Sequence, residues 1–167
     1  MSLIAAIIKF MPTYQTCISA PFGYVCICSS TDYVTRIELL ASKAPSNSRL
    51  NKFAKEAREQ VKAYLKNSAF KFDLPIDING SAYRKQVWSE IVKIPAGETR
   101  TYGDIATLVG SSARAVGGAC GDNVLPILIP CHRVVARADL GGFMHSSDGF
   151  SLKVKCWLLN HEGGLTS

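Results

Sequence analysis

The chain has 167 residues, of which 47% are hydrophobic and 19% are charged, with a formal net charge of +6 and a pI near 9.1. This composition indicates a soluble, globular protein with enough apolar material for one ordinary domain or two small ones. The positive charge is compatible with a nucleic acid partner, but it is divided between residues 1–79 (+4) and residues 80–167 (+2). We therefore expect a DNA-binding surface that relies on shape and a few placed arginines rather than on a broad basic patch.

The chain opens with an apolar run at residues 3–8, and Lys9 and Pro12 follow at once. The run is too short to span a bilayer, so it predicts a first strand rather than a signal peptide or a membrane helix, and a cytoplasmic or nuclear protein. The rest of the first forty residues alternates short β-branched segments with turn signals at 21–23 and 29–32. This alternation is typical of an antiparallel meander.

Residues 48–66 change to a helical period. Apolar side chains recur there at spacings of three and four and predict one buried stripe: Leu50, Phe53, Ala54, Ala57, Val61, Tyr64 and Leu65. The basic residues of the other face are expected to lie in water. A turn-rich stretch at 73–80 then places a domain boundary near residue 80, which divides the chain into domains 1–79 and 80–167.

Two helices are predicted near the start and the end of the second half. The first covers residues 83–94, ends at Pro95 and Gly97, and has four residues on one side: Tyr83, Val87, Trp88 and Ile91. The second covers residues 152–162, is closed by Gly163 and Gly164, and has a stripe of three residues: Leu152, Cys156 and Leu159.

A helix-turn-helix candidate lies between these two helices. Thr101 and Asp104 have the spacing of a capping box that opens a helix over 102–109, and Gly110 ends this helix. Ser111 and Ser112 cap a second helix that runs to Cys120. Apart from Arg114 this second helix carries almost only small side chains, as suits a helix that approaches another surface closely. Taken alone, Arg114 is an ordinary exposed charge.

The six cysteines, at positions 17, 26, 28, 120, 131 and 156, contain no C-x-x-C pair. Neither a zinc ribbon nor a disulfide scaffold is specified, and a reducing compartment fits best. Cys17, Cys26 and Cys28 could still pair or bind a metal in the fold. We expect no required metal.

The segment Pro130-Cys131-His132-Arg133 combines a nucleophile, a base and a fixed positive charge. The two neighbours would lower the pKa of the Cys131 thiol from about 8.5, which predicts a reactive thiolate. The alternative is a buried cysteine in a hydrophobic strand, because residues 125–129 are almost wholly apolar. Pro126 and Pro130 argue against a regular central strand, so we expect Pro130 to end the strand and to present Cys131 at its edge.

The second half also carries an ordered set of motifs. It comprises Val87-Trp88, Ile94-Pro95-Ala96-Gly97, Thr101-Tyr102-Gly103, Ala113-Arg114-Ala115-Val116-Gly117, Asn123, Ile129 to Val135, Leu140-Gly141-Gly142-Phe143, and Trp157 to Gly163. Together these motifs resemble the O6-alkylguanine-DNA alkyltransferases, and they cover nearly all of residues 80–167. The resemblance implies an α+β fold. A small N-terminal domain with an antiparallel sheet and a helix, variable in that family, would occupy 1–79, and a mostly helical, winged-helix-like domain would occupy 80–167.

The resemblance implies direct, irreversible transfer of an alkyl group from O6 of guanine in DNA to Cys131, which consumes the protein. A thiolate attacks the carbon in line, and guanine leaves when hydrogen bonds stabilise its developing charge. By the family pattern, His132 connects through a water to Glu162 and helps to draw the thiol proton. Tyr102 donates to the leaving guanine, and Asn123 holds the turn beside the nucleophile.

The resemblance also implies that a monomer binds double-stranded DNA containing O6-alkylguanine through the minor groove, with no cofactor, metal or membrane. The damaged nucleotide must leave the stack, and Arg114 would fill the vacated space. Val134 would offer its carbonyl to the guanine amine. The residues expected at DNA or substrate are Tyr102, Ser112, Ala113, Arg114, Ala115, Gly118, Arg133, Val134 and Phe143.

The sequence departs from the family pattern at three places. The turn before Arg114 is shorter than the commonest form, and Val124 stands where proline is usual. Residues 144–151 are longer than the usual glycine-rich loop that covers the alkyl group. This third departure bears on which alkyl groups the site accepts.

Two other functions remain as alternatives. A DNA-binding regulator or damage sensor would use the helix-turn-helix without transfer, as relatives that lack the cysteine do, and the presence of Cys131 argues against it. A cysteine hydrolase built on Cys131 and His132 would need turnover and an oxyanion site, for which the sequence has no motif. Covalent stoichiometry separates these functions, because a hydrolase regenerates its thiol.

Overall fold

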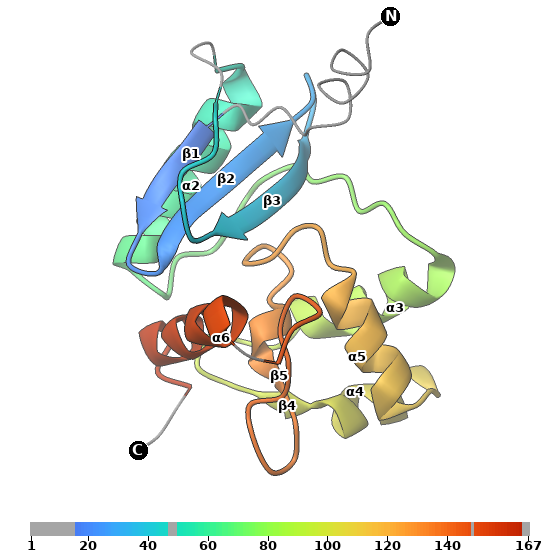
Figure 1. Cartoon of the computed structure of the whole chain (residues 1–167). Coiled ribbons are helices and arrows are strands. Elements are labelled where there is room, and N and C mark those ends of the chain that lie inside the picture. The colour runs from blue at the N-terminus through green and yellow to red at the C-terminus, as the bar shows by residue number, and fades with distance from the viewer. Residues whose placement is uncertain (1–15, 47–49, 148, 165–167) are drawn as a thin grey trace, which may run out of the picture.

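The structure is a computed structural model that describes residues 16–46, 50–147 and 149–164. Its first half is a three-stranded sheet with one helix, and its second half is mostly helical (Figure 1). The predicted α+β class is confirmed. The strand predicted at residues 3–8 lies outside the described residues.

The sheet is the predicted antiparallel meander, with strand order β1-β2-β3. Its strands are β1 (Thr16–Ala20), β2 (Gly23–Ser29) and β3 (Val34–Leu40). The β1–β2 turn requires glycine at position 23, where φ is 142° and a Cβ atom would overlap the carbonyl oxygen of Leu40. A side chain there would displace β3 from its place beside the turn.

A disulfide joins Cys17 on β1 to Cys26 on β2. The two residues are direct partners in the antiparallel register, with their Cα atoms 4.1 Å apart. Cys28, two residues further along β2, is a free and buried thiol. Of the possibilities that the sequence left open for these three cysteines, the structure therefore has the first two paired.

Helix α2 (Lys52–Lys66) packs against the sheet, largely as its apolar period predicts (Figure 1). It begins four residues later than predicted because the side chain of Asn51 caps it, accepting a hydrogen bond from the amide of Ala54 at 2.8 Å. The buried face consists of Ala54, Ala57, Gln60, Val61 and Tyr64. The last of these, Tyr64, reaches the second half of the chain.

The second half contains the predicted helices and two very short strands. They are α3 (Ala82–Val92), β4 (Arg100–Thr101), α4 (Tyr102–Val109), α5 (Ala113–Gly121), the 3-10 turn η1 (Cys131–Arg133), β5 (Val134–Val135) and α6 (Gly149–His161). The capping box of α4 is confirmed, with Thr101 and Asp104 bonding reciprocally. Gly110 ends α4 in the left-handed conformation, and Ser112 caps α5. The ends of these helices could be predicted from the sequence because each capping signal lies within one turn of helix.

The stripe predicted for the last helix was partly wrong. In α6 the buried residues are Val154, Lys155, Leu158 and Leu159, whereas Leu152 and Cys156 are half-buried. The error arose because a buried lysine does not register as apolar in a periodicity analysis. The helix is thus rotated relative to the predicted stripe, and Lys155 faces the interior.

The strand predicted at residues 125–129 is absent from this described part of the chain. The segment forms tight turns instead, with Ile127 at a φ of 75° and the amide of Ile129 donating to the carbonyl of Leu125 at 2.8 Å. Pro126 and Pro130 have no amide hydrogens to give to a ladder, which explains why the apolar run cannot join a sheet. Cys131 therefore begins a 3-10 turn and is 3% exposed, rather than lying at a strand edge.

The two halves share one hydrophobic cluster that includes residues from the sheet, α2 and all the helices of the second half. The amide of Ile37 on β3 donates to the carbonyl of Val124 at 2.9 Å. The ring of Phe22 also lies edge-on to Trp157 of α6, with the centroids 5.3 Å apart. The domain boundary near residue 80 stays a prediction. Within the described ranges, no helix is long and apolar enough to cross a membrane.

Candidate active site

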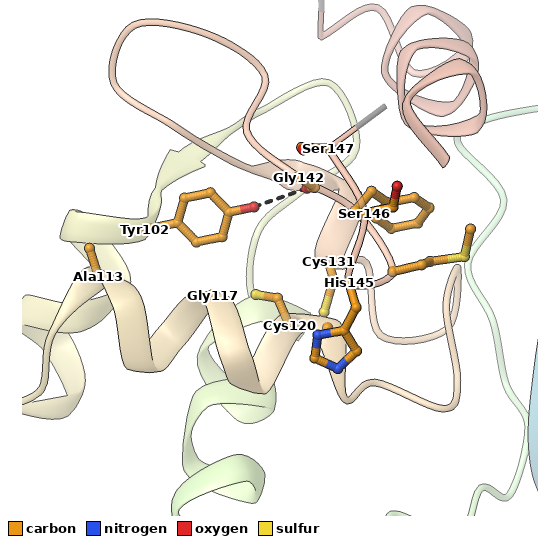
Figure 2. A pocket seen from close by; sticks show the side chains of 12 residues that line it. Tyr102, Ala113, Gly117, Cys120, Cys131, Gly142, His145, Ser146 and Ser147 are labelled. Atoms are coloured by element: carbon orange, nitrogen blue, oxygen red, sulfur yellow. Dashed lines mark hydrogen bonds between the residues drawn. The ribbon is translucent and has the colours of Figure 1, made fainter. Parts of the chain in front are cut away.

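A cavity of about 400 Å³ lies between α5 and the loop that precedes α6 (Figure 2). Cys131 contributes to its wall, together with Tyr102 from the start of α4. The α5 wall consists of Ala113, Gly117, Cys120 and Gly121, and the loop wall consists of residues 142–147. The nucleophile predicted from the sequence thus faces a space beside the second helix of the helix-turn-helix.

Asn123 fixes the position of the Cys131 sulfur. Its side-chain amide donates to the carbonyl of Ile129 at 2.8 Å and to Sγ of Cys131 at 3.2 Å. Its side-chain oxygen accepts from the amide of Leu125 at 2.9 Å. The predicted role of Asn123 in holding the turn beside the nucleophile agrees with this geometry, although Val124 replaces the usual proline.

The Cys131 thiol is not a resting thiolate. Burial raises the pKa of Cys131 well above its ordinary 9.0, and the hydrogen bond that the thiol donates to Cys120 raises it further, while Asn123 and Lys155 lower it. The expectation that Arg133 and His132 make Cys131 a thiolate was wrong, because adjacency in sequence does not bring those groups to the sulfur. Sγ must lose its proton when it reacts.

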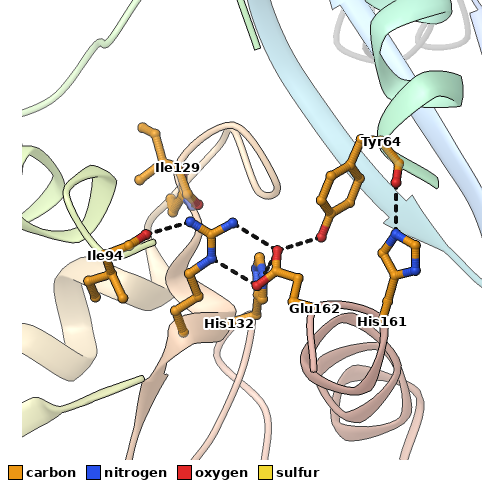
Figure 3. Close-up of polar contacts among 8 residues, drawn as sticks. Tyr64, Ile94, Ile129, His132, His161 and Glu162 are labelled. Atoms are coloured by element: carbon orange, nitrogen blue, oxygen red, sulfur yellow. Dashed lines mark hydrogen bonds and ion pairs between the residues drawn. The ribbon is translucent and has the colours of Figure 1, made fainter. Parts of the chain in front are cut away.

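Glu162 is a buried carboxylate that gathers three side chains (Figure 3). Its Oε1 accepts from the hydroxyl of Tyr64 at 2.7 Å and lies 3.0 Å from Nε2 of His132. The guanidinium of Arg133 donates to both oxygens, at 2.9 and 2.8 Å. Burial alone would raise the pKa of Glu162, but the hydrogen bonds from His132 and Arg133 outweigh it and hold the pKa well below 4.5.

The Glu162 carboxylate determines the tautomer of His132. An ionised carboxylate only accepts hydrogen bonds, so Nε2 of His132 carries the hydrogen and Nδ1 has the free lone pair. Burial lowers the pKa of His132 below 6.5, although Glu162 acts in the opposite direction, so the ring is neutral at pH 7. Nδ1 is buried and has no hydrogen-bond partner among the described residues. The site thus contains a neutral, oriented base one residue from the nucleophile.

The predicted water between His132 and Glu162 is replaced by a direct hydrogen bond. The Nε2–Oε1 distance of 3.0 Å leaves no space for a bridging molecule. No local pattern places Glu162 this near to His132, because the two residues are 30 positions apart and α6 brings Glu162 back across the fold. Any water in the proton path must lie on the Nδ1 side of the ring.

Lys155 is a fully buried lysine next to the cavity. Its Nζ donates to the carbonyl of Val134 at 2.7 Å and to that of Gly142 at 2.9 Å, and it lies 5.7 Å from the centre of the Tyr102 ring. Burial lowers the pKa of Lys155 to about 8, although the nearby thiols raise it. This side chain links β5 to the loop that lines the cavity.

Comparisons with known proteins identify the family to which this arrangement belongs. Residues 82–164 match the family model described as 6-O-methylguanine DNA methyltransferase, DNA binding domain. The constitutive methylated-DNA–protein-cysteine methyltransferase of Bacillus subtilis is 34% identical over 160 residues, which cover 89% of this chain and 94% of that protein. The methylated-DNA–protein-cysteine methyltransferase of Metallosphaera sedula is 38% identical over 160 residues, covering 93% and 96%. The chain belongs to this family.

A solved structure supports the same assignment over most of the chain. The O6-methylguanine methyltransferase of Mycobacterium tuberculosis has a TM-score of 0.76 at 30% identity, covering 94% of this chain and 96% of that one. The structure of the same protein in complex with DNA has a TM-score of 0.71, covering 88% and 91%. The chain is therefore a methylated-DNA–protein-cysteine methyltransferase that acts in DNA repair.

The residues predicted to face DNA in this methyltransferase fall into three groups. On α5, Ser112, Ala113, Arg114 and Gly118 are exposed and Ala115 is half-buried, so together they form an accessible surface. Tyr102 and Phe143 form the second group and line the cavity. The third group is Arg133 and Val134, which lie inside the protein.

Arg133 is committed to the interior of the methyltransferase. Its guanidinium binds Glu162 and the carbonyl of Ile94, and its side chain is 13% exposed, so the assignment of Arg133 to the DNA surface was wrong. Val134 is buried and its carbonyl accepts from Lys155. A contact of Val134 with guanine stays a prediction.

Four further residues of the methyltransferase site escaped the sequence analysis: Tyr64, Cys120, His145 and Lys155. Tyr64 and Glu162 are 98 positions apart, so no local pattern connects them. The signal for Lys155 was its place between apolar residues of α6. In the described part of the chain, no three His, Cys, Asp or Glu side chains gather in a way that could hold a metal ion. The expectation of no required metal stays a prediction.

Proposed function

We propose that the methyltransferase transfers one alkyl group from O6 of guanine in double-stranded DNA to its own Cys131 and is then spent. The observation that carries the proposal is the position of Sγ of Cys131, in the wall of a cavity that α5 and Tyr102 also line. A flipped guanine can enter this cavity from the side of α5, whose small residues allow DNA to come close.

The reaction is an in-line displacement at the alkyl carbon. The new bond joins Sγ of Cys131 to the carbon, and the bond from the carbon to O6 of guanine breaks. The thiol proton passes through a water to Nδ1 of His132, which has no direct hydrogen-bond partner in the described part of the chain, and Glu162 stabilises the imidazolium that forms. Tyr102 is placed to stabilise the leaving guanine, since it lines the cavity. Its hydroxyl donates to the carbonyl of Gly142 at 3.1 Å and would turn from there to the bound base.

The DNA partner is bound as duplex through its minor groove, by a monomer that works in the cytoplasm or the nucleus. Support comes from the accessible surface of α5 and from the relative of Mycobacterium tuberculosis, which has been solved in complex with DNA. Arg114 projects from the first turn of α5 and is exposed. It is the one long side chain on that helix and can occupy the space that a flipped nucleotide leaves.

The test is to mix the protein with a duplex oligonucleotide that carries one O6-methylguanine and to follow the intact mass. The wild type is expected to gain one methyl group per molecule, and Cys131→Ser none. Cys156→Ser is the matched control, since Cys156 is also a free thiol but lies outside the cavity. Binding of the oligonucleotide without any gain in mass would instead indicate a damage sensor, and repeated turnover would indicate a hydrolase.

Replacing Arg114 by Ala is expected to slow methyl transfer from duplex DNA about 10- to 100-fold, because unstacking a nucleotide costs a few kcal/mol. Transfer from a single-stranded oligonucleotide should change much less. Single-turnover rates on the two substrates measure this difference. Arg58→Ala on α2 is the control for the loss of an arginine, and an equal slowing on both substrates by Arg114→Ala would contradict the role in flipping.

A further inference from the structure

We propose that His145, held on Asp122, is a specificity-determining residue that fixes the loop wall of the Cys131 cavity and thereby limits the size of the alkyl group. The loop wall is the segment 142–147. This inference rests on the proposed function, since it concerns the substrate of the same cavity.

The loop wall faces the nucleophile across the cavity (Figure 2). Phe143 and Ser146 close a tight turn within it, with the Phe143 amide donating to the Ser146 carbonyl at 2.7 Å and the Ser146 amide donating back at 3.0 Å. The turn moves as a unit because its two ends are bonded to each other. The position of this unit relative to α5 therefore sets the width of the cavity.

The backbone of the loop wall does not favour this position by itself. Met144 and His145 are consecutive residues with φ of 51° and 57°, in the left-handed region that residues with a Cβ atom rarely adopt. Two such residues in succession persist only when contacts outside the segment hold them. A contact with another element of the fold must therefore stabilise the loop wall.

Lys155 and Tyr102 hold the loop wall at Gly142, and His145 holds the pair with positive φ against the end of α5. Its Nε2 lies 2.8 Å from Oδ1 of Asp122, the residue that caps the C-terminus of α5. The other oxygen of Asp122 pairs with Arg84 of α3, so the carboxylate is itself anchored to the helical domain. The imidazole ring also lies against Gly121, where a Cβ atom would overlap it. His145 thus fastens the loop wall to α5 by a hydrogen bond and by close packing.

The consequence concerns substituents larger than methyl. A longer alkyl chain bound at Sγ of Cys131 needs space that the loop wall occupies, so the wall must retreat or the chain is rejected. Retreat breaks the bond between His145 and Asp122 and gives up the packing on Gly121. The contact therefore lowers the rate for large groups more than the rate for methyl.

The experiment compares single-turnover transfer from oligonucleotides that carry O6-methylguanine or O6-butylguanine. His145→Ala and Asp122→Ala are each expected to raise the butyl-to-methyl rate ratio about 5-fold or more. The double variant should rise no further than His145→Ala, because Asp122 acts on the loop wall through His145. Glu98→Gln is the matched control, since it removes a carboxylate from an exposed ion pair with Arg100. Its ratio should equal that of the wild type.

A second readout does not depend on alkyl transfer. Peptide mapping follows the modification of Cys131 by a small thiol reagent, iodoacetamide, and by a bulky one, a biotin maleimide. The bulky-to-small ratio should rise in the same two variants. Unchanged ratios in both assays, or a rise that adds up in the double variant, would overturn the inference. If the wild type transfers no methyl group, the proposed function fails, and the reagent ratio still decides whether His145 restricts the cavity.

Discussion

Glu162→Ala is expected to lower the free energy of unfolding by about 3–5 kcal/mol, the usual cost of removing one partner from a buried ion pair. The carboxylate side chain is 1% exposed and receives hydrogen bonds from Tyr64, His132 and Arg133. Its removal leaves the Arg133 guanidinium in the interior without a counter-ion. Urea unfolding at pH 7 measures the loss.

Glu98→Gln is the control for Glu162→Ala, because Glu98 pairs with Arg100 where both side chains are about half exposed. Exposed pairs contribute about 0–1 kcal/mol, so this variant should unfold like the wild type. A loss for Glu162→Ala no larger than that of the control would contradict the account of Glu162 as the centre of a buried network.

The pH dependence of stability gives a second test of the buried network around Glu162. The folded pKa of Glu162 lies well below its ordinary 4.5, so the unfolded state binds more protons than the folded state between these two values. The stabilisation is complete above about pH 4.5 and is lost as the pH falls toward the folded pKa. Glu162→Gln should unfold with a smaller dependence on pH in this acid range than the wild type.

The second large effect is expected in the rate of transfer. His132→Gln should slow methyl transfer about 10²- to 10⁴-fold at pH 7, the usual contribution of a general base. The reason is that the Cys131 pKa is raised well above 9.0, so the thiol does not ionise by itself at neutral pH. Quenched mixing with a methylated oligonucleotide gives the single-turnover rate.

His161→Gln is the matched control, because His161 lies next to the same network: its ring packs edge-on against Tyr64, and its Nε2 lies 2.7 Å from the carbonyl of Tyr64. It should lose stability without a comparable loss of rate. The wild-type rate should still be constant at pH 6.5 and fall only at a lower pH, since burial lowers the pKa of His132 below 6.5. The His132→Gln rate should instead rise with pH, and a pH-independent rate in this variant would contradict general-base catalysis.

Much of the fold could be predicted because its signals are local. The capping box of Thr101 and Asp104, the Ser112 cap and the alternation in the sheet each lie within a few residues, so one sequence suffices to find them. The strand predicted at residues 125–129 was wrong because an apolar run is compatible with a strand or with buried turns. Only Pro126 and Pro130 indicated the turns. Because proline has no amide hydrogen to donate to a neighbouring strand, the segment does not join a sheet.

Most residues of the candidate site could be predicted from the sequence, but their contacts with one another could not. Cys131, His132 and Glu162 were found from their motifs, but the motifs do not state which ring nitrogen is free or how deeply the thiol is buried. The high pKa of Cys131 and the inward course of Arg133 depend on packing between segments far apart in the sequence. Tyr64 and Lys155 were missed for the same reason, since long-range contacts and not local spacing bring them to the site.

Locating the transferred methyl group tests most directly whether Cys131 is its acceptor. The protein would react with a duplex in which the methyl of O6-methylguanine is deuterated, and peptide mass spectrometry would then map the label. We expect one labelled methyl group per molecule, on Cys131 alone. Label on Cys120, which lines the same cavity, or an oligonucleotide that is bound and left methylated, would contradict it.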